Sequence, residues 1–119
     1  MPVLRDADRK SLEELAAELR ALALRARERK LQADEMKGGT FTISNQGAIG
    51  GGHFTPIINK PEVAILGIGR TAPKPVAVEG QRVEVRPVTA LSLSYDHRVV
   101  DGGTAARFMT DLEIGRAHV

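Results

Sequence analysis

A histidine between two charged residues, in Tyr95-Asp96-His97-Arg98, is the side chain of this sequence best suited to acid–base chemistry. A neutral imidazole, with an unperturbed pKa of roughly 6.5, accepts a proton readily near neutral pH. His97 is therefore a candidate general base. A structural histidine bonded to a main-chain carbonyl is the more common role of a lone imidazole, and composition and spacing alone favour that alternative.

The run that leads to His97 predicts a β-strand. Apolar and polar residues alternate along it. One set of alternate positions is apolar up to the histidine (Leu91, Leu93, Tyr95 and His97), and the other set is polar (Ser92, Ser94 and Asp96). A strand would place the imidazole on the apolar face and would end near it, where side chains can reach a cleft. Asp101-Gly102-Gly103 is typical of a turn and a helix N-cap, and a helix is predicted to start at Ala105. On residue type alone, Asp96 is a surface carboxylate, Arg98 its ion-pair partner and Asp101 a cap.

Four separate blocks of the sequence resemble one known family. They are Gly38–Asn45, Phe54–Asn59, Pro61–Gly67 and Tyr95–Gly102. In type, order and spacing these residues are similar to the dihydrolipoamide acyltransferase component of the 2-oxo acid dehydrogenase complexes, which shares its fold with chloramphenicol acetyltransferase. The resemblance runs from about Val3 to Leu112. It implies an α/β fold, a two-layer sandwich of the chloramphenicol acetyltransferase-like type, of which this chain holds the C-terminal half.

The resemblance also implies a site. In this family an acyl group passes between the thioester of dihydrolipoamide and the thiol of coenzyme A. His97 matches the general base of the family, and Ser44 matches the hydroxyl that stabilises the tetrahedral oxyanion. Asp101 stands where members carry Asp or Asn; positioning the base and capping a helix are equal alternatives for it. Asp96 and Arg98 are expected to form an orienting, ion-paired framework. Without the matched block, Ser44 would be read as a strand-end hydroxyl bonded to its own turn.

Composition limits the class of protein. The 119 residues allow at most one domain, and 3% aromatic residues make its core aliphatic. A net charge of +2 does not suggest a nucleic-acid-binding protein, and the absence of cysteine excludes disulfides and thiolate metal sites, so no metal site is predicted. Without a long apolar run or a signal-peptide core, the sequence predicts a soluble intracellular protein, cytoplasmic in a bacterium or in the mitochondrial matrix of a eukaryote.

The N-terminal region predicts an amphipathic helix. Ser11 and Glu14 form a capping-box pattern, and Gly38-Gly39 ends the helical region. The apolar positions recur at steps of three and four residues: Leu12, Leu15, Leu19, Leu22 and Ala26. The opposite face is charged, which is typical of a solvated surface.

Four strands are predicted after this helix. They are Thr40–Ser44, Val63–Ile68, Arg82–Val85 and the run before His97. Pro73 and Pro75 indicate an exposed connection between the second and third of them. The glycine cluster 47–52 lacks the features of a phosphate-binding loop and predicts a flexible or tight turn, to which His53 belongs without a catalytic task. The expected order is therefore helix, four strands and helix.

Residues 1–112 are expected to be part of an acyltransferase catalytic domain, because the family domain is about twice as long and follows lipoyl and subunit-binding domains. Residues 113–119, Glu113 to Val119, depart from the family pattern and resemble a sequencing adapter translated in one frame. We expect this segment to be non-native and give His118 no function. The isolated chain is expected to be inactive.

Partners follow from the resemblance as well. Family members are trimers that assemble into larger cores, with the histidine and the serine of each site contributed by different chains, and they work with decarboxylase and dihydrolipoamide dehydrogenase components. Coenzyme A is then a substrate, and the lipoyl group is carried on a domain outside this chain; no nucleic acid or membrane partner is expected. Acetyl or branched-chain transfer is favoured over succinyl. The alternatives are a noncatalytic oligomeric scaffold or inactive fragment and, well behind, a free-standing acetyltransferase related to chloramphenicol acetyltransferase.

Overall fold

The computed structural model describes residues 1–115, which fall into two compact units that divide after Thr40. The first unit holds the helix α1 (Leu12–Arg27) between two short 3₁₀ turns, η1 (Ala7–Arg9) and η2 (Ala33–Met36). The second unit contains three strands and one helix. These are β1 (Thr42–Asn45), β2 (Ala64–Val78), β3 (Arg82–Tyr95) and α2 (Gly102–Gly115), with 3₁₀ turns η3 (Gly47–Ile49) and η4 (Glu79–Gln81).

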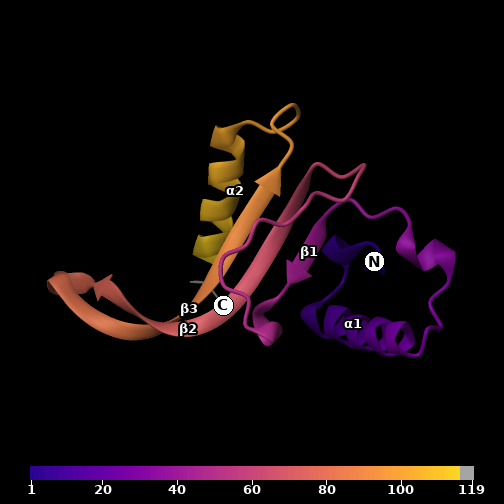
Figure 1. Cartoon of the computed structure of the whole chain (residues 1–119), viewed down its shortest axis with the longest axis horizontal. Helices are drawn as coiled ribbons and strands as arrows, with labels where there is room; N and C mark the ends of the chain where they lie inside the picture. The colour runs from indigo at the N-terminus through magenta and orange to yellow at the C-terminus, as the bar shows by residue number, and fades with distance from the viewer. Residues whose placement is uncertain (116–119) are drawn as a thin grey trace. The chain divides into compact units, whose positions relative to one another are not determined.

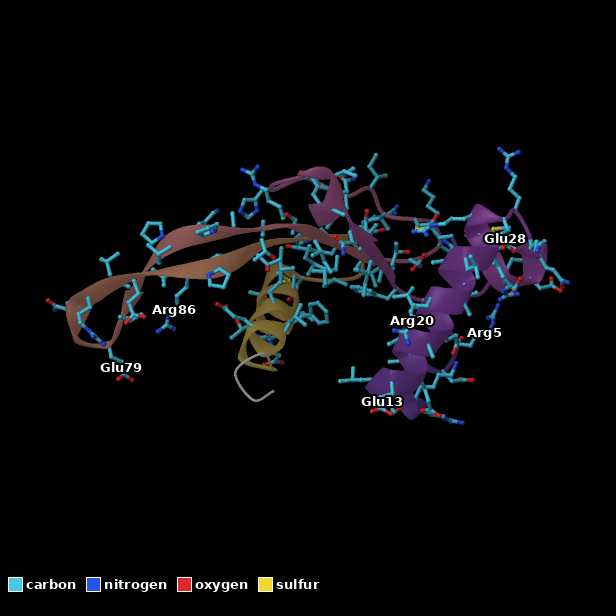
Figure 2. The ribbon with its side chains drawn as sticks, turned by 90° about the horizontal axis from the view of Figure 1, so that it is seen from below. Arg5, Glu13, Arg20, Glu28, Glu79 and Arg86 are labelled. Atoms are coloured by element: carbon cyan, nitrogen blue, oxygen red, sulfur yellow. The ribbon has the colours of Figure 1, made fainter. Side chains whose placement is uncertain are left out.

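The capping box predicted for α1 is confirmed. The Ser11 hydroxyl accepts the Glu14 N–H at 3.2 Å, and the Glu14 carboxylate accepts the Ser11 N–H at 2.7 Å. Within the apolar stripe Leu22 is buried, whereas Leu12 is 80% exposed. The charged side chains of Glu13 and Arg20 project from the helix, and Glu28 follows at its C-terminal end (Figure 2).

The second unit is built on a mixed sheet in the order β1-β2-β3 (Figure 1). β1 runs parallel to β2, with Thr42 opposite Ile65 and Asn45 opposite Ile68. β2 and β3 form a long antiparallel hairpin that extends well beyond β1 and α2 (Figure 1). The core lies where all four elements meet, and its buried apolar residues are Ile65, Leu66 and Ala105.

The sequence prediction of four strands is wrong at the hairpin. The segment Arg82–Val85 and the run before His97 form one continuous strand, β3, and Pro73 and Pro75 lie inside β2 instead of in a connection. Among the described residues β1 pairs with β2 only as far as Ile68, and the Gly51 carbonyl then accepts the Arg70 N–H at 2.6 Å. Beyond Arg70, this edge of β2 pairs with no strand among the described residues. A proline whose missing N–H would have faced that edge interrupts no ladder.

Two element ends also differ from the sequence prediction. β1 begins at Thr42 rather than at residue 40. α2 begins at Gly102, not at Ala105, because the Asp101 carboxylate accepts the Thr104 N–H at 2.6 Å and so starts the helix one turn earlier. α2 takes in the first three residues of the predicted non-native segment 113–119, and residues 116–119 lie outside the described residues.

The two faces of β1 contact different segments. Thr42 is 8% exposed on the face of the loop that joins β1 to β2, whereas Ile43 is 59% exposed on the other face. On the side of Ile43, the ring of Phe41 lies against Phe108 of α2, with 5.9 Å between centroids. Across residues 1–115, no helix has both the length and the apolar character that a membrane span requires.

Candidate active site

His97 lies in the turn between β3 and α2. The last main-chain contact of the sheet joins the Asp96 N–H to the Val63 carbonyl at 2.8 Å, and the Asp96 carbonyl then accepts the N–H groups of Val99 and Val100. β3 stops at Tyr95, close to the histidine as predicted, so the imidazole belongs to the turn that follows the strand and not to the strand itself. His97 is exposed, with its ring 5.8 Å from that of Tyr95.

Asp96 and Arg98 form an ion pair that spans the histidine. The Arg98 guanidinium donates from Nε to Oδ1 at 3.0 Å and from its terminal nitrogen to Oδ2 at 2.7 Å, and the Arg98 N–H donates to Oδ1 at 3.0 Å. These bonds, above all those of the guanidinium, lower the pKa of Asp96 to about 2 and raise that of Arg98. Asp96 is therefore ionised throughout the neutral range and holds the turn from both sides of His97.

Asp101 caps α2 and faces the same turn. Hydrogen bonds from Thr104 lower the pKa of its carboxyl, with smaller contributions from the Gly103 N–H and from the charge of a protonated His97. Asp101 performs the cap that its residue type predicts, and its place in the same turn, four residues after His97, is compatible with a positioning role.

Ser44 lies on β1, the strand at the opposite edge of the sheet from β3. It is half-buried and stands opposite Gly67 of β2, which in turn stands opposite Ser92 of β3. The turn after β1 is bonded by Asn45, whose side-chain oxygen accepts the Gly47 N–H at 3.0 Å. The alternative for Ser44 was a hydroxyl bonded to the turn that follows its strand. In the structure the neighbouring residue, Asn45, makes a bond of this kind.

The loop between β1 and β2 covers the face that carries Ser44. Gly67 is buried under the ring of Phe54, where a Cβ atom would come within 2.8 Å of the ring carbon Cζ. A shallow cavity of about 240 Å³ opens beside this contact; its lining residues are His53, Phe54, Thr55, Ser92, Leu93 and Ser94. Its position was not predicted from sequence, because the loop meets β3 only in the folded chain.

The candidate residues do not form one cluster. A single turn holds His97, Asp96, Arg98 and Asp101. Ser44 lies two strands away, level with Ser92, which is three residues before the end of β3. Strand and rung spacings put the Cα atoms of Ser44 and Tyr95 roughly 14 Å apart. His97 follows Tyr95 by two residues, so this separation argues against Ser44 and His97 acting on one carbonyl within the same chain.

Residues 1–114 match the family model of the 2-oxoacid dehydrogenases acyltransferase (catalytic domain). A curated relative is the dihydrolipoyllysine-residue acetyltransferase component of the pyruvate dehydrogenase complex from Staphylococcus aureus, 55% identical over 113 residues. The match covers 95% of this chain and 26% of the relative. The chain thus spans about a quarter of the length of that relative.

Solved structures agree with this match. One is the dihydrolipoamide acetyltransferase of Azotobacter vinelandii, from an investigation of the role of a serine, a histidine and an asparagine in its catalytic mechanism, with a TM-score of 0.89 and 55% identity over 93% of this chain and 45% of that one. Another is the cubic core of a pyruvate dehydrogenase multienzyme complex, with a TM-score of 0.87 and 54% identity over 92% of this chain and 44% of that one. The predicted α/β fold of the chloramphenicol acetyltransferase-like type is confirmed, and the chain belongs to the 2-oxoacid dehydrogenase acyltransferase (catalytic domain) family.

Proposed function

We propose that this chain supplies the His97 and Ser44 parts of an acyltransferase site that moves an acetyl group between dihydrolipoamide and coenzyme A. The observation that carries the proposal is the His97 turn, in which the Asp96–Arg98 ion pair and the Asp101 cap fix the backbone on both sides of an exposed imidazole. Acetyl is preferred to other acyl groups because the relatives are named as acetyltransferases.

His97 acts as the general base. A free thiol, with a pKa near roughly 8.5, is mostly protonated at neutral pH, so its attack on a thioester is faster when a base takes the proton. Neither Asp96, with a pKa of about 2, nor its partner Arg98 is suited to that transfer. Their role is to hold the turn, while Asp101 positions the imidazole.

Ser44 stabilises the oxyanion. Attack of the thiol on the thioester carbonyl places negative charge on oxygen, and one hydroxyl aimed at that oxygen contributes about 3 kcal/mol to the transition state. The relative from Azotobacter vinelandii supports the assignment, because a serine, a histidine and an asparagine were investigated in its mechanism in this order along its chain. This chain has Asp101 in place of the asparagine.

The separation of Ser44 and His97 within one chain favours a site between subunits. A homotrimer with each site shared by two chains brings the serine of one chain to the histidine of its neighbour. Assembly of such trimers into a larger core, with decarboxylase and dihydrolipoamide dehydrogenase components attached, fits the cubic core to which the chain is similar. Coenzyme A enters as a substrate, and the lipoyl group comes from a domain outside these residues.

The test uses a hybrid protein in which residues 1–114 of this chain replace the matching stretch of the Staphylococcus aureus relative. We expect the hybrid to assemble and to transfer acetyl from coenzyme A to dihydrolipoamide, and His97→Ala to lower kcat by roughly 10²–10⁴-fold. A hybrid that assembles with the same turnover as its His97→Ala variant would contradict the proposal and would favour the scaffold alternative.

A further inference from the structure

We infer that Glu62 is a positioning residue for Ser44, and that the segment from Asn59 to Val63 joins the serine strand to the histidine turn within each chain. This inference rests on the proposed function. It concerns a carboxylate that lies outside both candidate groups of site residues, two positions before β2 begins.

The Glu62 carboxylate holds β1 directly. The buried Thr42 hydroxyl lies 2.9 Å from Oε1 and 3.0 Å from Oε2 of Glu62, and donates to this carboxylate. Successive side chains on a strand alternate, so Thr42 and Ser44, with one residue between them, project from the same face of β1. A contact that holds Thr42 therefore also restrains the strand backbone that carries Ser44.

The carboxylate is itself fixed by a tight turn. The Asn59 side-chain amide donates to Glu62 Oε2 at 3.1 Å, and the Glu62 N–H donates to the Asn59 carbonyl at 2.9 Å. The Glu62 carboxylate thus accepts hydrogen bonds from both Thr42 and Asn59, and this restricts the movement of the Thr42 side chain. A charge-assisted hydrogen bond of this kind is stronger than one between neutral groups.

The next residue along the chain holds the histidine turn. The Val63 carbonyl accepts the Asp96 N–H at 2.8 Å, directly before His97. One short segment therefore contacts Thr42 through a side chain and Asp96 through the main chain. In the proposed trimer, Ser44 and His97 of one chain belong to different sites, so this segment links two neighbouring sites.

β1 needs such a contact because its own pairing is limited. The strand has 4 residues, and among the described residues it pairs on one side only, with β2. Parallel pairing is slightly less stable per residue than antiparallel pairing, so a ladder this short contributes little to fixing the strand. Displacement of an oxyanion donor by about 1 Å costs on the order of 10²-fold in rate.

The experiment is a double-mutant cycle in the hybrid, with Glu62→Ala, Ser44→Ala and the combination. We expect Glu62→Ala to lower kcat by roughly 10–10²-fold with KM little changed, because the displaced Ser44 hydroxyl acts only in the transition state. In the Ser44→Ala background the same change should have almost no further effect. Glu62→Gln keeps an acceptor for Thr42 and should restore most of the rate, whereas Thr42→Val should resemble Glu62→Ala.

Glu84→Ala and Thr89→Val are the matched controls, because they remove a carboxylate and a hydroxyl from the distal hairpin, where Glu84 pairs with Arg86 and Thr89 with Thr71. Full additivity of Glu62→Ala and Ser44→Ala, or a loss that Glu62→Gln does not restore, overturns the inference while the proposed function stands. If Ser44→Ala itself leaves kcat unchanged, the proposed role of Ser44 fails, and the inference fails with it.

Discussion

Arg98 binds the carboxylate of Asp96 at both oxygens, at 3.0 Å and 2.7 Å, across the residue that lies between them. The pair closes a short loop of backbone around His97 and leaves the imidazole exposed. Bidentate pairs of this kind are geometrically specific, so the contact fixes the turn more than an ordinary surface ion pair would.

The ion pair predicts how stability depends on pH. Folding lowers the pKa of Asp96 from 3.8 to about 2. The ion pair therefore contributes fully to the free energy of unfolding above pH 3.8, and this contribution is lost as the pH falls toward 2. Asp96→Asn should remove that part of the acid dependence. The measurement is the unfolding temperature of the hybrid against pH, for both proteins. If the unfolding temperature falls equally steeply with acid in both proteins, the Asp96–Arg98 pair contributes nothing to stability.

Ser44→Ala should lower kcat on the order of 10²-fold in the hybrid, with KM nearly unchanged, because the hydroxyl acts on charge that develops only in the transition state. Steady-state kinetics in both substrates measure the effect. Thr89→Val, which removes a hydroxyl far along the hairpin, should turn over normally. A rise in KM at constant kcat would instead assign Ser44 to substrate binding.

Asp101 can be tested for its two roles separately. Asp101→Ala should lower both the unfolding temperature and kcat, because the cap of α2 and the carboxylate proposed to position His97 are lost together. Asp101→Ser retains a capping group but no carboxylate, so we expect the unfolding temperature to recover and kcat to stay low. Recovery of both quantities would show that capping is the whole role of this residue.

Gly67→Ala should destabilise the fold by about 1–3 kcal/mol, since its Cβ would overlap the ring of Phe54. Denaturant unfolding of the hybrid measures the change. Gly52→Ala is the matched control, because a Cβ at Gly52 has no neighbour within 4 Å. If both variants unfold at the same denaturant concentration, the contact between Phe54 and Gly67 is not tightly packed.

Local signals in the sequence predicted local structure well. The capping box of Ser11 and Glu14 involves residues three apart, and the structure forms it as expected. The Asp101 cap was also visible, although the helix that it starts was placed one turn too late. In each case the interacting groups are close in sequence, so a propensity for that conformation can be read directly.

The remaining errors concern contacts between distant segments. Pro73 and Pro75 suggested a loop, and only the extent of β1 explains why a strand accepts them. The contact between Thr42 and Glu62 joins residues 20 apart and leaves no periodic pattern in the sequence. Ser44 and His97 could be identified from the motifs of the family. Their separation depends on the strand register of the sheet, which the sequence alone did not predict.

The prolines of the hairpin have a consequence for how the protein behaves at high local concentration. Pro73 and Pro87 face each other across the two strands, with Pro75 nearby, and none of them has an N–H to offer to an added strand. The long arm thus presents broken rows of donors along its outer edges and resists stacking with copies of itself. In the core proposed above, the missing N–H groups disfavour strand pairing between the arms of neighbouring chains.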